Sequence, residues 1–284
     1  MLLFSRRDIL ASLLVSIMAL PLSVAVAMAS GAPMSAGWIG AAVGGLVIGL
    51  LSKIPLQVST PSAGLVVLLA AWLSELGWPA LCLITACAGV LQTLIGIFKL
   101  ADGFLMIAPG ILHGILAGLG ISTVANQLHH LSAGNDSLAL GCGVLTLMVA
   151  VFWQLVGWKK IPAPLVALVA VTLLSLWVPT ELLRLDMSDF ARFDLIALNA
   201  ESNWADLGIP ILTLTLVATI ESLVCADAVR RLCPGTSLRL DQELSVQGVG
   251  NVVSGLLGGL PVCGAITLSK ANIRVGAQSR WAAV

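Results

Sequence analysis

Long apolar runs separated by short polar connections dominate the chain. Interpreted as helices, they form segments at about 9–29, 36–52, 62–76, 79–98, 106–127, 137–157, 163–178, 206–226, 242–258 and 263–275. A helix needs about 20 residues to cross a bilayer, so the segments at 62–76 and 263–275 are too short to cross it. The pattern predicts an all-α, polytopic membrane protein in which these two segments are half-helices.

The stretch KIPLQVSTPSAG, residues 53–64, interrupts the apolar pattern. Pro55 and Pro61 cannot continue a helix, so we expect the stretch to be extended. Unpaired backbone at membrane depth is tolerated only where it faces protein or a water-filled cavity. We therefore expect a helix to restart near Ser62, deep in the membrane, with its first N–H groups free. An ordinary short loop between two full helices is the alternative.

Two stretches near the C-terminus resemble two near the N-terminus. Residues 206–222 resemble 8–23, and 249–269 resemble 39–64, where a glycine-rich helix precedes a proline-bearing break. Seven helices separate equivalent points, so the second copy is inverted, as is typical of secondary transporters. The predicted parts are a first repeat at 1–178, an extracytoplasmic loop at 179–205 and the start of a second repeat at 206–284.

The two breaks favour an anion as ligand. Half-helix N-termini that face each other near the midplane present free N–H groups and the positive ends of two helix dipoles. Cys263, Gly264 and Ala265 are expected at the start of the second half-helix, where small side chains allow a close approach to the backbone. Gln57 either lines the cavity or satisfies backbone groups.

Glu221 lies about 15 residues into the eighth segment, a depth at which a carboxylate is costly and usually functional. Cys225 shares its helix face at position i+4. Glu221 could bind sodium or carry a proton, and the alternative is a structural carboxylate bonded to a nearby backbone break. Asn251, among the glycines of the ninth segment, is expected to form a hydrogen bond between helices.

The composition agrees with a membrane protein and argues against several classes of partner. Hydrophobic residues make up 58% of the chain and charged residues 10%, with a mean hydropathy of +1.04. The net charge of zero argues against nucleic acid. The six cysteines form no C-x-x-C pair, and no catalytic or phosphate-binding motif is present. We expect no metal, no cofactor and no enzymatic activity.

The charges predict an orientation. If the N-terminus is cytoplasmic, only Arg184 and Arg192 of the 14 Lys and Arg fall outside. This positive-inside bias predicts a multi-pass protein of the inner (plasma) membrane with a cytoplasmic N-terminus. Arg6 and Arg7 are interpreted as anchors of the first helix, and a twin-arginine signal peptide is the alternative.

Several stretches resemble the SulP family, the sulfate permeases or solute carrier 26 proteins. These are DILASLLVSIMALPLSVAVAMASGAP at 8–33, LQVSTPSAG at 56–64, IESLVCADAV at 220–229, QELSVQGVGNVVSGLLGGLPVCGAI at 242–266 and SKANIRVGA at 269–277. The resemblance implies two inverted seven-helix repeats, with core and gate domains, and anion transport by an elevator-type movement of the core.

The resemblance also implies positions for the site, between the third and tenth helices. The implied anion ligands are Ser59, Thr60, Ser62, Ala63, Gly64, Cys263, Gly264 and Ala265. Glu221, with Cys225, is the implied coupling position, and Pro21 and Ser23 are expected to line the same cavity.

Three departures from the family pattern matter. Sodium-coupled bicarbonate relatives have an aspartate and a hydroxyl residue at the positions of Glu221 and Cys225, so this pair favours protons. Thr60 replaces the usual glycine before the third-helix proline. The chain stops where helix eleven should begin, without helices eleven to fourteen or the cytoplasmic STAS domain, so we expect a fragment of a longer chain.

The leading hypothesis is a proton-coupled secondary transporter of small inorganic anions, sulfate or bicarbonate first and a C4-dicarboxylate next. A nucleobase:proton symporter of the related fold and a non-transporting, truncated membrane scaffold are the alternatives. The expected partners are the inorganic anion, a coupling proton or sodium ion, the lipid bilayer and a second copy of the chain in a homodimer.

Overall fold

Helices form most of the part of the chain that the structure describes. The computed structural model describes residues 5–105, 114, 117, 118, 120–125, 127, 128, 137–157, 161–175, 177, 204–233 and 239–284. The α-helices are α1 (Arg6–Ala29), α2 (Met34–Ala42), α3 (Val66–Ile97), α4 (Ala101–Leu105), α6 (Ser137–Val156), α7 (Ala163–Ser175), α8 (Trp204–Leu232), α9 (Leu240–Leu256) and α10 (Ile266–Val275). Most of the predicted segment 106–127 and nearly all of the loop 179–205 lie outside the described residues.

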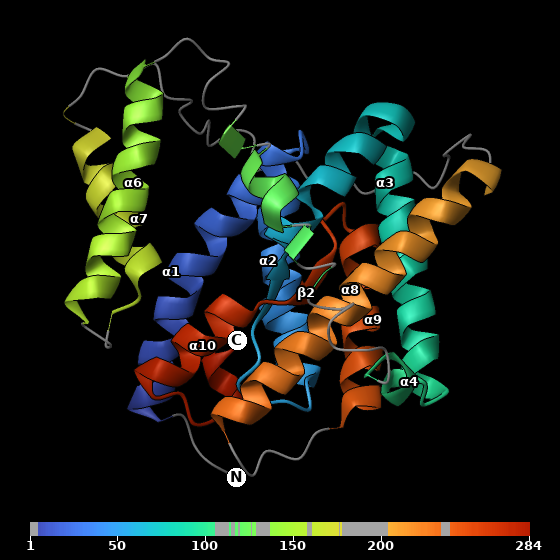
Figure 1. The fold of residues 1–284 in the computed structure, drawn as a ribbon. Coiled ribbons are helices and arrows are strands. Elements are labelled where there is room, and N and C mark those ends of the chain that lie inside the picture. The colour runs from blue at the N-terminus through green and yellow to red at the C-terminus, as the bar shows by residue number, and fades with distance from the viewer. Residues whose placement is uncertain are drawn as a thin grey trace.

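Three helical stretches of the described part are long and apolar enough to cross a membrane, namely Arg6–Ala29, Ala63–Ile97 and Asp206–Leu232. Shorter apolar helices accompany them at Met34–Gly49, Leu140–Val156 and Ala163–Ser175. Figure 1 shows α3 and α9 side by side, with α8 crossing in front and the α6–α7 pair standing beside α1. The chain is therefore a multi-pass membrane protein.

Glycines allow α3 and α9 to approach until their backbones touch. A Cβ added at Gly89 would lie 2.5 Å from the Val252 nitrogen and 2.6 Å from the Gly248 oxygen. Such close contact between small residues is a main source of helix association within membranes, where lipid removes the hydrophobic drive. The α3–α9 pair forms the rigid support on which both interrupted segments rest.

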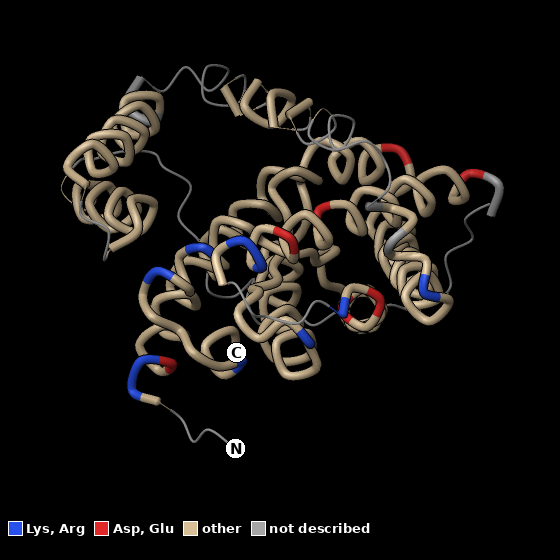
Figure 2. Tube along the Cα trace, turned by 60° about the horizontal axis from the view of Figure 1, so that its bottom comes forward, with Lys and Arg blue, Asp and Glu red and all other residues tan. Residues whose placement is uncertain are grey.

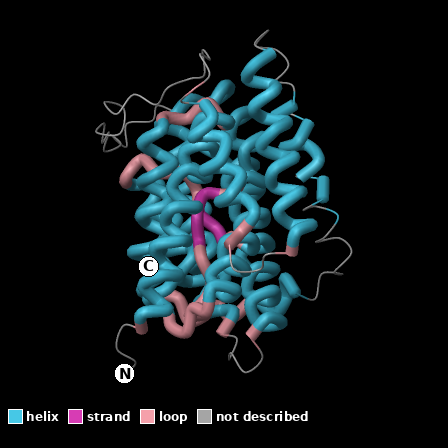
Figure 3. The backbone as a smooth tube through the Cα atoms, turned by 90° about the vertical axis from the view of Figure 1, so that its left-hand side faces the viewer, coloured by secondary structure: helices cyan, strands magenta, loops and turns pink. Residues whose placement is uncertain are grey.

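The all-α fold class is confirmed, and a pair of three-residue strands lies at the centre of the helices. β1 (Ser59–Pro61) pairs antiparallel with β2 (Val262–Gly264), and Figure 3 shows the pair surrounded by helices. The pairing satisfies backbone groups of two segments that have no helical bonds, as burial requires. The stretch 53–64 is thus no surface loop, because Ser59 and Thr60 are 3% and 2% exposed.

Several predicted helix boundaries change. The predicted separation of the segments 62–76 and 79–98 is confirmed, because α3 (Val66–Ile97) is broken by a kink at Gly77, whose φ of 81° and ψ of 173° are not helical. A 3-10 turn at Ala63–Leu65 precedes it. α10 begins at Ile266 and not at 263, because residues 262–264 are held in β2. Within the predicted helix 36–52, residues Val43–Gly49 form a π-helix.

Basic residues of the described part gather at one end of the molecule. They lie at the start of α1 and α9, after α3, and at the ends of α8 and α10. In Figure 2 most of them lie on the side turned toward the viewer, which is the lower end in Figure 1. Figure 2 also shows acidic positions on the far side of the molecule, away from that end. This asymmetry agrees with the positive-inside rule.

Candidate functional site

The strand pair brings the two breaks together. Ser59 pairs with Gly264, Thr60 with Cys263 and Pro61 with Val262. The chain runs from β1 into α3 and from β2 into α10, so both half-helices start at the same place. This pairing across about 200 residues of sequence is the arrangement that inverted repeats with broken helices produce.

The first turn of α10 leaves hydrogen-bond donors free, whereas at the start of α3 Leu65 N donates to the Ser62 backbone oxygen at 3.2 Å and Val66 N to the Ala63 oxygen. At α3, the Gly64 N–H donates to the Ser62 side-chain oxygen at 3.1 Å, so this end is partly capped. At α10, no side chain caps the helix, and its first internal bond is from Ser269 N to the Ala265 oxygen. The N–H groups of Ile266, Thr267 and Leu268 therefore have no partner within α10.

A cavity of about 410 Å³, which we call the central cavity, opens at these helix starts. Its lining residues are Leu22, Thr60, Pro61, Ser62, Ala63, Gly64, Glu221, Cys263, Gly264, Ala265, Ile266, Thr267 and Leu268. The described part of this lining contains no lysine or arginine, and the two helix N-termini give it positive potential. The Thr60 hydroxyl is buried and has no hydrogen-bond partner, which leaves one more donor for a ligand.

Among the described lining residues, Glu221 of α8 is the acidic one. It is 8% exposed, and one carboxylate oxygen, Oε2, accepts a hydrogen bond from the Cys263 thiol at 2.7 Å. A Cβ at Gly64 would lie 2.5 Å from the other oxygen, Oε1, so this glycine lets the carboxylate reach the α3 start. The carboxylate thus lies between the start of α3 and β2, in the wall of the central cavity.

The structure gathers most of the residues that sequence reasoning proposed as anion ligands. Thr60, Ser62, Ala63, Gly64, Cys263, Gly264 and Ala265 line the central cavity. Ser59 does not, because its hydroxyl is held by the Gln247 amide at 2.7 Å. Cys263 and Gly264 lie in β2, before the helix start rather than in it.

The predicted cavity-lining residues fall elsewhere. On α1 the lining residue is Leu22, whereas the Ser23 hydroxyl is turned into α1 and donates to the Ala19 oxygen at 2.7 Å. Pro21 is also outside the lining, and Gln57 is buried behind β2, near Gly264.

Cys225 does not accompany Glu221 in the central cavity. Its thiol lies 3.4 Å from the Ser269 hydroxyl, between α8 and α10, and it is fully buried. The thiol that contacts the Glu221 carboxylate is Cys263. The i+4 spacing placed both side chains on one face of α8, and only the first reaches the cavity.

One face of α9 holds both breaks, and sequence reasoning named only Asn251 of this set. The Glu243 carboxylate accepts from the Ser52 hydroxyl and Lys53 N, and Gln247 donates to Ser59. Asn251 accepts from Val262 N at 2.6 Å, and Ser254 donates to the Leu260 oxygen at 2.6 Å. The signal was the spacing of polar residues at 243, 247, 251 and 254 in an apolar helix, which repeats about every turn.

Asn251 also forms the expected bond between helices, from its side-chain amide to Gln92 Oε1 of α3 at 2.9 Å. The α9 face thus connects the loop before β1, β1 itself and the segment leading into β2. Within the described residues, Gln247 Oε1 and Gln92 Nε2 of this network are buried without a hydrogen-bond partner.

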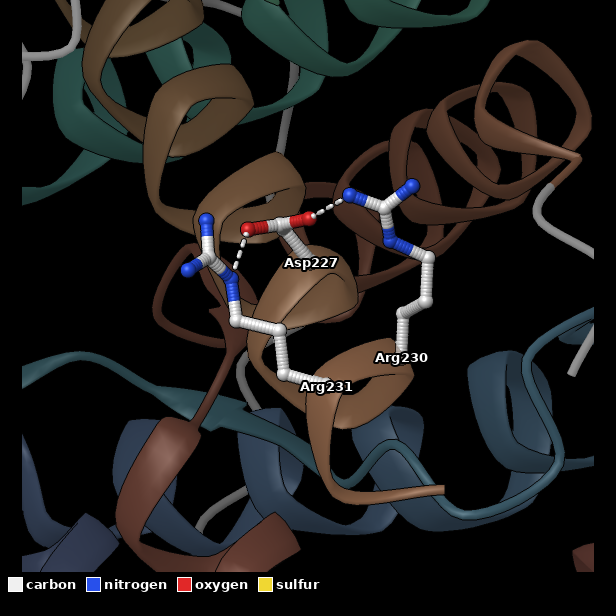
Figure 4. Close-up of polar contacts among 3 residues, drawn as sticks. All are labelled: Asp227, Arg230 and Arg231. Atoms are coloured by element: carbon white, nitrogen blue, oxygen red, sulfur yellow. Dashed lines mark hydrogen bonds and ion pairs between the residues drawn. The ribbon is translucent and has the colours of Figure 1, made fainter. Parts of the chain in front are cut away.

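Asp227 lies near the basic end of α8 and pairs with Arg230 at 2.5 Å and Arg231 at 2.7 Å (Figure 4). The two arginine side chains are 53% and 77% exposed, so solvent screens the pairs. Within the described residues, no group of three or more His, Cys, Asp or Glu could hold a metal ion.

We predict that Asp227→Asn changes the free energy of unfolding by at most about 1 kcal/mol, because exposed ion pairs contribute little. Anion uptake should equal that of the unmodified chain. SDS titration and uptake assays check both, and a large loss of uptake would give Asp227 a role that its position does not suggest.

Comparison with known proteins identifies relatives. The model described as "Sulfate permease family" matches residues 6–139 and 136–284. The bicarbonate transporter BicA of Picosynechococcus sp. is 27% identical over 96% of this chain and 54% of its own length. The putative sulfate transporter YvdB of Bacillus subtilis is 25% identical over 96% of this chain and 57% of its own length. The chain spans about half the length of these curated relatives, which are named as transporters and not as enzymes.

Solved structures share the fold. The transmembrane domain of a cyanobacterial BicA matches with a TM-score of 0.82 at 23% identity, over 99% of this chain and 80% of that one. The murine anion transporter Slc26a9 in its inward-facing state matches with a TM-score of 0.78 at 15% identity, over 98% of this chain and 54% of that one. The inverted-repeat transporter fold predicted from the sequence is consistent with both.

Proposed function

Because the chain belongs to the sulfate permease family, we propose that it forms the anion-binding part of a secondary transporter for a small inorganic anion, sulfate or bicarbonate. The observation that supports this is the meeting of two half-helix N-termini and the unpartnered Thr60 hydroxyl in one cavity without a cation. Backbone N–H groups at helix starts bind oxyanions without any lysine or arginine. Thr60, Ser62, Ala63, Gly64, Cys263, Gly264 and Ala265 would surround the anion.

Glu221 is the proposed coupling group. An ionised carboxylate beside the helix starts repels an anion, and a proton on Glu221 removes that repulsion. Proton and anion then bind together, and each raises the affinity for the other by the same factor. A sodium ion could neutralise the carboxylate instead. A thiol at Cys263 offers sodium a poorer ligand than oxygen, which favours the proton.

The proposed movement is of the elevator type. α1, α2, α3, α8, α9 and α10 surround the strand pair and would move as one body with the anion, past the α6–α7 pair (Figure 1). The gathering of basic residues at one end supports a cytoplasmic N-terminus in the inner membrane. Assembly as a homodimer remains part of the proposal.

The test is uptake of labelled sulfate and bicarbonate into proteoliposomes that contain the complete gene product, with a proton or a sodium gradient imposed. A proton gradient should drive uptake in the unmodified protein. Glu221→Gln should abolish this dependence, and the apparent anion affinity should lose a pH sensitivity of about tenfold or more. Glu75→Gln, which alters an exposed carboxylate of α3, is the matched control.

The same assay separates the other candidates. If a C4-dicarboxylate or a nucleobase inhibits uptake at concentrations below those of sulfate and bicarbonate, that compound and not the inorganic anion is the substrate. If a sodium gradient drives the uptake and Glu221→Gln abolishes this effect, sodium and not the proton is the coupling ion. Absence of uptake under every gradient would support a non-transporting scaffold.

A further inference from the structure

We propose a second anion site one to two helical turns from the central cavity, at the basic end of α10. It rests on the proposed function in that the same anion would occupy both sites in turn. A second cavity of about 420 Å³, which we call the basic cavity, lies between α10, α1 and the α6–α7 pair. Its lining residues are Met18, Trp153, Gln154, Gly157, Ile161, Pro162, Ala163, Pro164, Thr267, Lys270, Ala271 and Arg274.

The charges that line this cavity all have one sign. Lys270 and Arg274 are both exposed, and the lining residues that the structure describes include no Asp or Glu. Within the described part of the chain, neither forms an ion pair. Like charges spaced by four residues slightly destabilise a helix, and an anion between them would relieve this repulsion. The negative end of the α10 dipole stabilises the positive charge of Arg274, which lies in the last turn. It does not stabilise the charge of Lys270, which lies in the middle of the helix.

The N-terminus of α7 adds positive potential from the opposite wall. Pro162, Ala163 and Pro164 at this helix start all line the basic cavity. The positive end of the α7 dipole therefore faces the same space as the two cationic side chains. Met18, Trp153 and Ile161 provide apolar surface, which strengthens the field inside a cleft. Two cationic side chains and one helix N-terminus around one cavity favour an anion as its ligand.

Thr267 connects this cavity to the site already described. It lines both the central and the basic cavity. At 1.5 Å per residue, Lys270 stands about 4.5 Å and Arg274 about 10 Å further along the α10 axis. An anion that moves along α10 from the basic end meets Arg274, then Lys270, then the free N–H groups. The basic cavity would collect anions for the central cavity, and so raise the rate of loading.

The test replaces the cations one at a time, by Lys270→Gln and Arg274→Gln, in the complete gene product in phosphatidylcholine vesicles. The KM for sulfate and bicarbonate should rise about tenfold with Vmax unchanged, because capture and not translocation is lost. Potassium gluconate should raise the KM of the unmodified protein and leave that of the variants nearly constant, since salt screens exposed charges. Lys270→Arg should restore the low KM.

Arg239→Gln is the matched control, because Arg239 is an exposed cation at the same end of the molecule but lies outside both cavities. A KM and a salt dependence of the Gln variants equal to those of Arg239→Gln would overturn the proposal. So would an effect that arises only when phosphatidylglycerol is added, because a lipid headgroup would then be the occupant.

A second measurement keeps the proposal testable if no anion is transported. Trp153 lines the basic cavity. Its contribution to the fluorescence is obtained by subtracting the emission of the Trp153→Phe variant from that of the unmodified protein. Iodide should quench this signal more strongly than neutral acrylamide does, and the excess should disappear in both Gln variants but persist in Arg239→Gln and Glu221→Gln. Excess quenching without uptake would remove the proposed transport and retain the site. Equal quenching by iodide and acrylamide would remove the site.

Discussion

Gly89→Ala is expected to lower the free energy of unfolding by about 2–3 kcal/mol, because overpacking of a tight contact costs this much. The added methyl group would lie 2.5 Å from Val252 N and 2.6 Å from the Gly248 oxygen. Both are backbone atoms of α9, so no side chain can rotate away. The two helices must move apart, and the contacts that hold α9 beside α3 are lost along their length. SDS titration in mixed micelles measures the change.

Gly141→Ala is the matched control, because the same change in α6 meets no atom within 4 Å. It should stabilise the helix by up to about 1 kcal/mol, since alanine has the higher helix propensity. Equal effects of the two substitutions would contradict the close α3–α9 packing. The comparison separates backbone contact from helix propensity, which acts at both positions.

The loss at Gly89 should extend to transport. α9 holds β1 through Gln247 and the segment before β2 through Ser254. A shift of α9 relative to α3 therefore changes the position of both strands. We expect that uptake falls in Gly89→Ala even at temperatures where the protein stays folded.

Much of the site could be predicted because the local signals were strong. Pro55 and Pro61 exclude a helix, and the helix that follows must start inside the membrane. Glu221 is conspicuous because a carboxylate is rare within an apolar segment. These are properties of single residues and their immediate neighbours, which a sequence displays directly.

The register of β1 with β2 could not be read in the same way. Strand pairing between residues 59–61 and 262–264 depends on contacts across most of the chain, and it shortens α10 by three residues relative to the expected start at 263. Ser59 was expected to be an anion ligand because the resemblance to the SulP family implied it. In the structure the Ser59 hydroxyl accepts a hydrogen bond from the Gln247 amide of α9. The two residues lie far apart in the sequence, so the sequence alone does not indicate this contact.

Side-chain direction was the other limit. Pro21 and Ser23 are adjacent to Leu22, which faces the central cavity, and a rotation of α1 by one residue decides which of the three does so. Cys225 and Glu221 share a helical face, but the cavity reaches only one turn of it. The sequence analysis named only Asn251 on the polar face of α9. The other polar residues of this face bond to backbone breaks that become their neighbours only after folding.

Asn251→Leu is expected to weaken both the fold and anion binding. Its side chain accepts from Val262 N at 2.6 Å and donates to Gln92 Oε1 at 2.9 Å, and the residue is 2% exposed. Leucine leaves both partners buried without a bond, which costs about 1–3 kcal/mol for each. Val262 opens β2, so a loosened Val262 shifts Cys263 and Gly264 at the cavity wall. The KM for the transported anion should rise, and the free energy of unfolding should fall.

Gln92→Leu separates the two effects, because it removes the bond to α3 and retains the one to β2. It should lower the free energy of unfolding without raising KM, if Asn251 positions the anion site through Val262. Gln242→Leu, an exposed amide on the same helix, should change neither quantity. A KM for Asn251→Leu that matches that of Gln92→Leu would show that α9 supports the site only by general stability. A KM that rises in Asn251→Leu but not in Gln92→Leu would show that the Asn251 amide positions the anion site. This side chain of α9 bonds both to Gln92 of α3 and to Val262 of β2.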